Sequence, residues 1–216
     1  MELPVLQVPD TVVFPGMTIT FELVGTGHRR LVRRVLNQNE HRFLVSLPES
    51  GTVTGDRHVL PEYGTSMLVL SVDGKQESGY LVTAQGQGRQ RIRHVRNLPK
   101  PDAVADGDLL LVRDEPAPLG RGTPNDELLE AWDTAAVFVR YAGRFLPARM
   151  QSQIGEALPD EPFYVASFVC ANCVLEPDEQ QQLLAAPTLV DRLRLVRSKM
   201  RRQLGESASS EEPVTA

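Results

Sequence analysis

Residues 3–17 read LPVLQVPDTVVFPGM, and this stretch decides the fold class. Its β-branched residues predict a strand over 5–8, a turn, and a second strand over 12–14. A tight turn should follow, because Pro15 presets its own φ angle and Gly16 can adopt a positive φ. The stretch contains no catalytic motif. It therefore predicts the first turn of a β-rich module onto which other elements pack.

Length and composition describe an ordinary globular chain. It has 216 residues, of which 41% are hydrophobic and 24% charged, and a formal net charge of −5. An acidic balance argues against a dedicated nucleic-acid binder, because such domains are usually basic. There is no basic, apolar leader at the N-terminus and no run of 18 apolar residues. We therefore expect a soluble cytoplasmic protein without a membrane-spanning helix.

The first half of the chain has the period-two patterning of β-strands. A turn is predicted at Asp73-Gly74, a dipeptide that is typical of hairpins. An amphipathic helix is predicted over 28–37, with apolar residues on one face and arginines on the other. The further strands are predicted over 18–24, 43–47, 67–72, 79–84, 90–95 and 108–112.

A change of composition and of period marks the second half. Residues 114–124 carry three prolines and two glycines, which is typical of a linker or a long surface loop. Helices are then predicted over 128–142, 148–158, 163–173, 178–185 and 189–204. The first of these helices has one apolar stripe, formed by Leu128, Leu129, Trp132, Ala135, Ala136, Val139 and Ala142.

The predicted organisation is therefore of the α+β class. It consists of a β-rich subdomain over 1–115, a linker over 116–124 and an all-α helical bundle over 125–205. A Ser/Glu-rich tail over 206–216 is expected to be disordered.

Four motifs in order resemble the N-terminal, substrate-binding domain of Lon proteases over roughly residues 3–204. They are Pro4-Val-Leu with Asp10-Thr-Val-Val-Phe-Pro-Gly-Met17, Tyr63-Gly-Thr65, Gly86-Gln-Gly-Arg-Gln-Arg-Ile92, and Pro177-Asp-Glu-Gln-Gln-Gln-Leu-Leu184 followed by Val190-Asp-Arg-Leu193. The resemblance implies a PUA-like pseudo-barrel followed by a helical subdomain. It also implies non-catalytic binding of protein segments.

The sequence departs from the full-length proteases in one informative way. No G-x-x-x-x-G-K-[ST] loop is present in the sequence to hold nucleotide phosphates, and we expect the protein to lack the ATPase and peptidase modules. The chain thus resembles a stand-alone Lon-N-like protein, and we expect neither an enzyme nor a cofactor.

Five residues are the candidate binding residues. Phe14 and Met17 either contact unfolded segments or fill the core. We favour the core alternative, because large apolar residues are more often buried. Arg89, Arg91 and Arg93 should project from one face of a strand. They either bind phosphate, RNA or an acidic peptide, or protect an exposed sheet edge, which we favour.

Two other polar motifs are expected to have structural and not functional roles. Cys170-Ala-Asn-Cys173 lacks the further ligands of a zinc site, so we expect two buried small hydrophobes and no metal. The basic residues between Arg192 and Arg202 lie opposite an apolar stripe and should form a solvated helix face.

The functional hypothesis is polypeptide recognition, in a groove between the sheet and the helices with arginines on its rim. The expected partners are unfolded or specific protein segments, together with a protease or chaperone system. RNA binding through the barrel and the arginine clusters is the alternative. The two clusters are Arg29–Arg34 and Arg89–Arg96, which would have to merge into one basic face. RNA binding is disfavoured because no aromatic residue lies inside either cluster.

Overall fold

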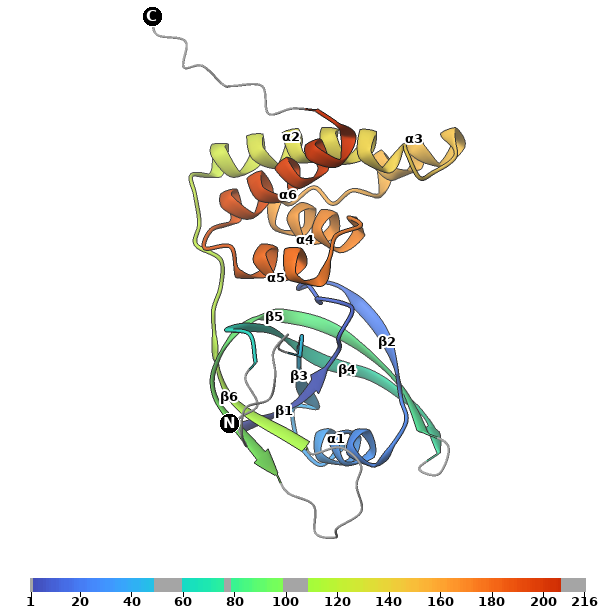
Figure 1. Ribbon diagram of the computed structural model, residues 1–216, viewed down its shortest axis with the longest axis vertical. Coiled ribbons are helices and arrows are strands. Elements are labelled where there is room, and N and C mark those ends of the chain that lie inside the picture. Colours follow the sequence, from blue (N-terminus) through green and yellow to red (C-terminus); the bar gives the residue numbers. More distant parts are fainter. Residues whose placement is uncertain (1, 49–59, 76–78, 99–108, 207–216) are drawn as a thin grey trace, which may run out of the picture. The chain divides into compact units, whose positions relative to one another are not determined.

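The computed structural model describes residues 2–48, 60–75, 79–98 and 109–206, and Figure 1 shows its elements. The chain forms two compact units. One, the β unit, comprises Met1–Pro118 and Leu175–Ala185, and the other, the helical unit, comprises Leu119–Val174 and Ala186–Ala216. The α+β class is therefore confirmed. The predicted tail lies outside the described residues, except for Glu206.

The β unit is built on one mixed sheet of six strands in the order β2-β5-β4-β3-β1-β6. A further pairing of β5 with β6 closes the sheet on itself, as in a barrel. All neighbouring strands are antiparallel except β1 and β3. The strand bounds are β1 Glu2–Gln7, β2 Thr18–Leu23, β3 Arg42–Ser46, β4 Tyr63–Lys75, β5 Gly79–Leu98 and β6 Leu109–Pro116.

The longest strand, β5, replaces the two shorter strands that the sequence predicts. Residues 80–85 of β5 pair with β2, and residues 90–98 pair with β6, while β4 runs along its other edge. The Asp73-Gly74 dipeptide also differs from its prediction. It lies inside β4, with Gly74 paired to Tyr80, so the connection to β5 falls at residues 76–78, outside the described residues.

Helix α1, Thr26–Leu36, supplies apolar side chains to the core of the β unit. Its buried residues Leu31, Val32 and Val35 join a cluster that includes Phe43 and Met67. Its two arginines in the last turn, Arg33 and Arg34, are exposed. The predicted amphipathic pattern is confirmed.

Residues 12–14 form no strand, contrary to the prediction. They form a buried loop whose backbone is bound by other elements instead of a ladder. The Thr65 hydroxyl donates to the carbonyl of Val13 at 2.6 Å, and the amide of Val12 donates to Gln180 Oε1 at 3.1 Å. Buried polar backbone groups need such partners, which explains how the loop can leave the sheet.

The turn after this loop is fixed against β5. The amide of Gly16 donates to the carbonyl of Gly86 at 2.8 Å, and the amide of Gly86 donates to the carbonyl of Met17 at 2.8 Å. A Cβ atom on Gly86 would lie 2.7 Å from the carbonyl oxygen of Phe14. Glycine is therefore required on β5 where this turn approaches it.

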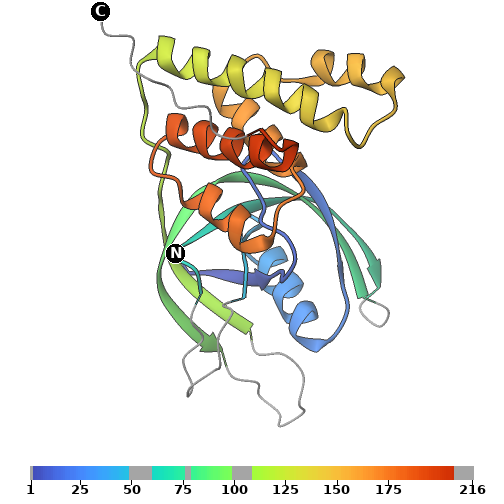
Figure 2. The same ribbon diagram turned by 45° about the horizontal axis from the view of Figure 1, so that its top comes forward.

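The helical unit contains α2, Pro124–Ala142, α3, Ala148–Ala157, α4, Pro162–Asn172, and α6, Leu189–Leu204. Helices α2 and α6 lie side by side in both views (Figures 1 and 2). Threonine caps begin both helices: Thr123 accepts from the amide of Asp126 at 3.2 Å, and Thr188 accepts from that of Asp191 at 3.0 Å. No helix in the described ranges is long and apolar enough to span a bilayer.

The remaining helix, α5, Pro177–Ala185, departs from the predicted organisation. The sequence assigns it to the helical bundle, but it belongs to the β unit. Its side chain Gln181 donates to the carbonyl of Tyr63 at 2.9 Å, at the start of β4. Helical periodicity alone cannot tell whether a helix buries its apolar face against other helices or against a sheet.

Candidate functional site

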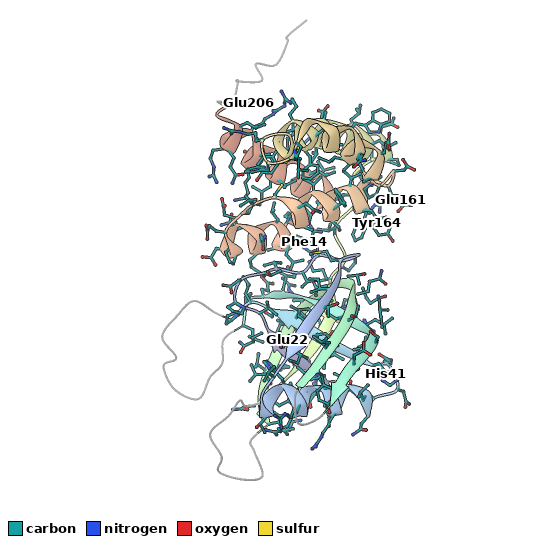
Figure 3. The ribbon with its side chains drawn as sticks, turned by 90° about the vertical axis from the view of Figure 1, so that its right-hand side faces the viewer. Phe14, Glu22, His41, Glu161, Tyr164 and Glu206 are labelled. Carbon is teal, nitrogen blue, oxygen red and sulfur yellow. The ribbon has the colours of Figure 1, made fainter. Side chains whose placement is uncertain are left out.

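Phe14 and Met17 lie in the β unit, with Phe14 in the loop at the end opposite α1 (Figure 3). The Phe14 side chain is fully buried. Its amide donates to the sulfur of Met17 at 3.1 Å, so the two residues close the turn on each other. The geometry agrees with the core alternative for Phe14, and this ring offers no surface to a partner.

Arg89 is also a structural residue. Its side chain is 8% exposed and donates from Nε to Ala117 O at 2.6 Å, from Nη1 to Leu184 O at 3.0 Å and from Nη2 to Pro118 O at 3.1 Å. The guanidinium also lies over the Tyr63 ring, 4.6 Å from its centroid. Desolvation lowers the pKa of Arg89 below its usual value. Arg89 therefore attaches two segments to β5. They are residues 117–118, where the chain leaves the β unit, and Leu184 in the last turn of α5.

Arg91 is partly exposed and Arg93 is exposed, and both are paired with acids. Arg91 Nε donates to Glu62 at 2.6 Å, which raises the pKa of Arg91, and Arg93 Nε donates to Glu115 at 2.8 Å. Arg91 lies where β5 pairs with both β4 and β6, so it does not protect a sheet edge, whereas Arg93 lies at the bulge in the β5–β6 pairing, beyond the last β4 partner that the structure describes. Both form ion pairs with acids that are far away in the sequence, Glu62 just before β4 and Glu115 in β6.

The basic strip of α6 is only partly solvated, which corrects the prediction. Arg192 is fully buried and Lys199 is 8% exposed. Arg197 bridges Glu130, at 2.8 Å, and Asp133, at 3.2 Å, on the neighbouring helix α2. Much of this strip therefore attaches α6 to α2.

The two cysteines are buried free thiols. Burial raises the pKa of Cys170 to about 12 and also raises the pKa of Cys173, so both are protonated at neutral pH. Among the residues that the structure describes, no three His, Cys, Asp or Glu side chains gather as a metal site.

The helical unit contains a large open cavity of about 420 Å³, which we call the aromatic groove. Its walls come from α2, α3, α4 and the chain that follows α2 and α4. The side chains that define it are mostly aromatic or aliphatic, and include Phe138, Tyr141, Phe145, Ile154, Phe168 and Val174. A cavity of this size and character is typical of a binding site for apolar groups.

Ring contacts and one buried hydroxyl hold the groove together. Phe138 meets Phe168 edge-to-face at 5.8 Å, and Tyr141 meets Phe145 at 5.2 Å. The buried Tyr141 hydroxyl accepts from the amide of Val174 at 3.0 Å, and its burial raises the pKa of Tyr141. The inner rings are thus fixed, while Phe145 and Val174 are 61% and 67% exposed.

A second cavity lies in the β unit, between β1, β6 and the start of α1. Its volume is about 240 Å³, below the ~300 Å³ at which ligand pockets usually begin. The aromatic groove is therefore the stronger candidate.

The groove was not predicted from the sequence, although the distribution of aromatic residues along the chain points to it. Seven of the chain's twelve aromatic residues lie between Trp132 and Phe168. Trp132, Phe145 and Tyr164 of this group are exposed, and exposed aromatic residues often mark interaction sites.

Comparisons with known proteins agree on one family. A family model for the ATP-dependent protease La (LON) substrate-binding domain matches residues 2–202. A Lon protease from Desulfovibrio desulfuricans is 23% identical over 219 residues, which cover 94% of this chain and 22% of that protein. The chain thus spans about a fifth of the length of this relative.

Two solved structures share the fold. The N-terminal domain of a Mycobacterium avium complex Lon protease has a TM-score of 0.70 and 20% identity, covering 93% of this chain and 98% of that one. A Lon N-terminal domain protein from Xanthomonas campestris has a TM-score of 0.62 and 19% identity, covering 92% and 98%.

Proposed function

Because the chain belongs to the family of ATP-dependent protease La (LON) substrate-binding domains, we propose that it recognises polypeptide segments and performs no catalysis itself. The family assignment supports a role in substrate recognition, and the match is to the binding domain of the protease. The expected ligands are unfolded or otherwise exposed protein segments, delivered to or withheld from a protease or chaperone system in the cytoplasm.

The observation that carries this proposal is the aromatic groove. Its rings are fixed by one another, so little conformational entropy is lost when an apolar side chain enters. Exposed Phe145 and Val174 at its rim would be covered by the ligand. Unfolded segments differ from folded surfaces in presenting large apolar side chains, which is the feature that such a groove selects.

The arginines add less to this function than the sequence suggested. Arg89 is buried, and Arg91 and Arg93 are paired with Glu62 and Glu115. These ion pairs reduce the positive field that an RNA backbone would need, so we retain RNA only as a probe in the test.

Replacing Phe145 by alanine tests the proposal. We expect about tenfold weaker binding of a labelled unfolded polypeptide in fluorescence anisotropy, because an exposed aromatic anchor is lost. Binding should survive moderate salt, since the contact is apolar. The matched control is Tyr164→Ala, which removes a 48% exposed ring on α4 that does not line the groove.

Equal binding by the wild type, Phe145→Ala and Tyr164→Ala would exclude the groove. Absence of polypeptide binding by the wild type would reject the function itself. Binding of single-stranded RNA that collapses as salt is raised would favour the alternative.

A further inference from the structure

Helix α2 presents a second apolar face outward. Trp132 is 66% exposed, Leu129 is 58% exposed and Leu128 is 37% exposed. The stripe continues through Ala135, Ala136 and Val139, of which Ala136 is exposed. We call these six residues the α2 outer face. A stripe with this spacing normally faces a core, so its exposure requires an explanation.

The orientation of the helix is fixed by polar contacts on its opposite face. Thr134 is buried and donates to the carbonyl of Leu193 on α6 at 3.3 Å. Glu127 is buried and accepts from the amide of Gly122 at 2.9 Å. Rotating α2 to bury the outer face would break both hydrogen bonds. The outer face is therefore a built surface of the folded unit.

Side-chain size is graded along the α2 outer face. Its first half carries the large residues Leu128, Leu129 and Trp132, whereas its second half carries Ala135, Ala136 and Val139. If a second copy packs antiparallel about a two-fold axis near Ala135 and Ala136, large residues meet small ones. Trp132 of one copy then lies opposite Val139 of the other. Parallel packing would place Trp132 against Trp132 and leave gaps between the alanines.

Charge is graded in the same sense along one flank of the outer face. Asp126 and Asp133 lie on the first half, and Arg140 lies on the second half of the same flank. In an antiparallel pair related by a two-fold axis perpendicular to the helices, this flank of one copy meets the same flank of the other copy in the reverse direction, so the acids of one copy face Arg140 of the other.

These charged groups already have partners within the chain. Asp133 pairs with Arg197 at 3.2 Å and Arg140 pairs with Glu206 at 3.3 Å, but their side chains are 70% and 58% exposed. They can therefore accept a second partner. Exposed pairs of this kind select an orientation more than they add affinity.

We propose that two copies of this chain associate through their α2 outer faces, packed antiparallel about a two-fold axis near Ala135 and Ala136. Both gradients, of size and of charge, make this face complementary to itself in that arrangement alone. A single helix pair buries less than the ~1,200 Å² of a standard interface, so the dimer is weak and depends on concentration. This inference concerns α2 and does not depend on the proposed function.

The only tryptophan of the chain, Trp132, reports directly on this interface. We expect the full chain to shift from monomer to dimer in sedimentation velocity as its concentration rises from low micromolar to near-millimolar. Trp132 emission should shift to shorter wavelength over the same range, because the indole leaves water. Leu129→Glu should abolish both changes, because it places a charge in the apolar contact.

Tyr164→Glu is the matched control, since it also adds a carboxylate at an exposed apolar site of the helical unit. This variant should dimerise as the wild type does. A wild type that stays monomeric with constant emission would overturn the proposal. So would a dimer that Leu129→Glu leaves intact.

Cysteine crosslinking tests the orientation. Under mild oxidation Ala136→Cys should form a covalent dimer, because the two-fold axis brings the two copies of this residue together. Leu128→Cys should not, because antiparallel packing places its two copies at opposite ends. The native cysteines are buried and do not interfere. Crosslinking of Leu128→Cys in place of Ala136→Cys would indicate parallel packing and overturn the assignment.

Discussion

Phe14→Ala should lower the free energy of unfolding by about 3–5 kcal/mol. The ring is fully buried, and the loop that carries it has little freedom to collapse onto a cavity. Its neighbours are fixed to other elements by the Thr65–Val13 and Gly16–Gly86 hydrogen bonds. The measurement is urea unfolding followed by circular dichroism.

The control for this substitution is Phe145→Ala, the same change at a site that is 61% exposed. It should cost about 1 kcal/mol or less, because little apolar area returns to water. Similar losses for the two variants would show that Phe14 does not fill the core. Below its unfolding transition, Phe14→Ala should still bind the polypeptide probe, which separates a packing residue from a binding residue.

Arg89→Met should cost about 3 kcal/mol of the free energy of unfolding. Methionine keeps the apolar stem, but it removes the donors that serve the carbonyls of Ala117, Pro118 and Leu184. The carbonyl of Leu184, a buried residue, is then left without this donor and carries the full cost of desolvation. We also expect faster amide hydrogen exchange in α5, because its last turn loses its attachment to β5.

Arg93→Met provides the comparison, since Arg93 lies on the same strand and has one exposed ion pair with Glu115. Its loss should cost about 1 kcal/mol or less. If Arg89→Met were no more harmful than Arg93→Met, or if exchange in α5 were unchanged, the structural role of Arg89 would be refuted.

Much of the fold could be predicted from local patterns. The bounds of α6 were predicted correctly, because Thr188 caps its start and Gly205 adopts a left-handed φ of 77° at its end. The single long strand β5 was missed, because Gly86 and Gly88 appeared to break it. Gly86 in fact permits the close approach of a loop that is distant in sequence, and a local pattern does not record such approaches.

The candidate site was harder to predict, because the role of a charged side chain depends on the residues with which it pairs. Arg91 and Arg93 looked available because their partners are distant in the sequence, Glu62 just before β4 and Glu115 in β6. The apolar stripe of α2 was recognised, but periodicity does not tell whether a stripe faces the core of its own chain or solvent. The orientation follows from the buried residues of the opposite face, which include the hydrogen-bonded Thr134 and Glu127.

The assignment of α5 to the β unit has a consequence for how the chain can be divided. Residues 119–174 are an excursion that leaves the β unit at Pro118 and returns to it at Leu175, before the chain departs again after Ala185. Neither unit is therefore a continuous segment that one cut could release. A chain cut after residue 118 would leave the sheet without α5, and docking α5 first requires closing a loop through the whole excursion. The boundary between the two units is therefore defined by which residues pack together, and no single peptide bond marks it.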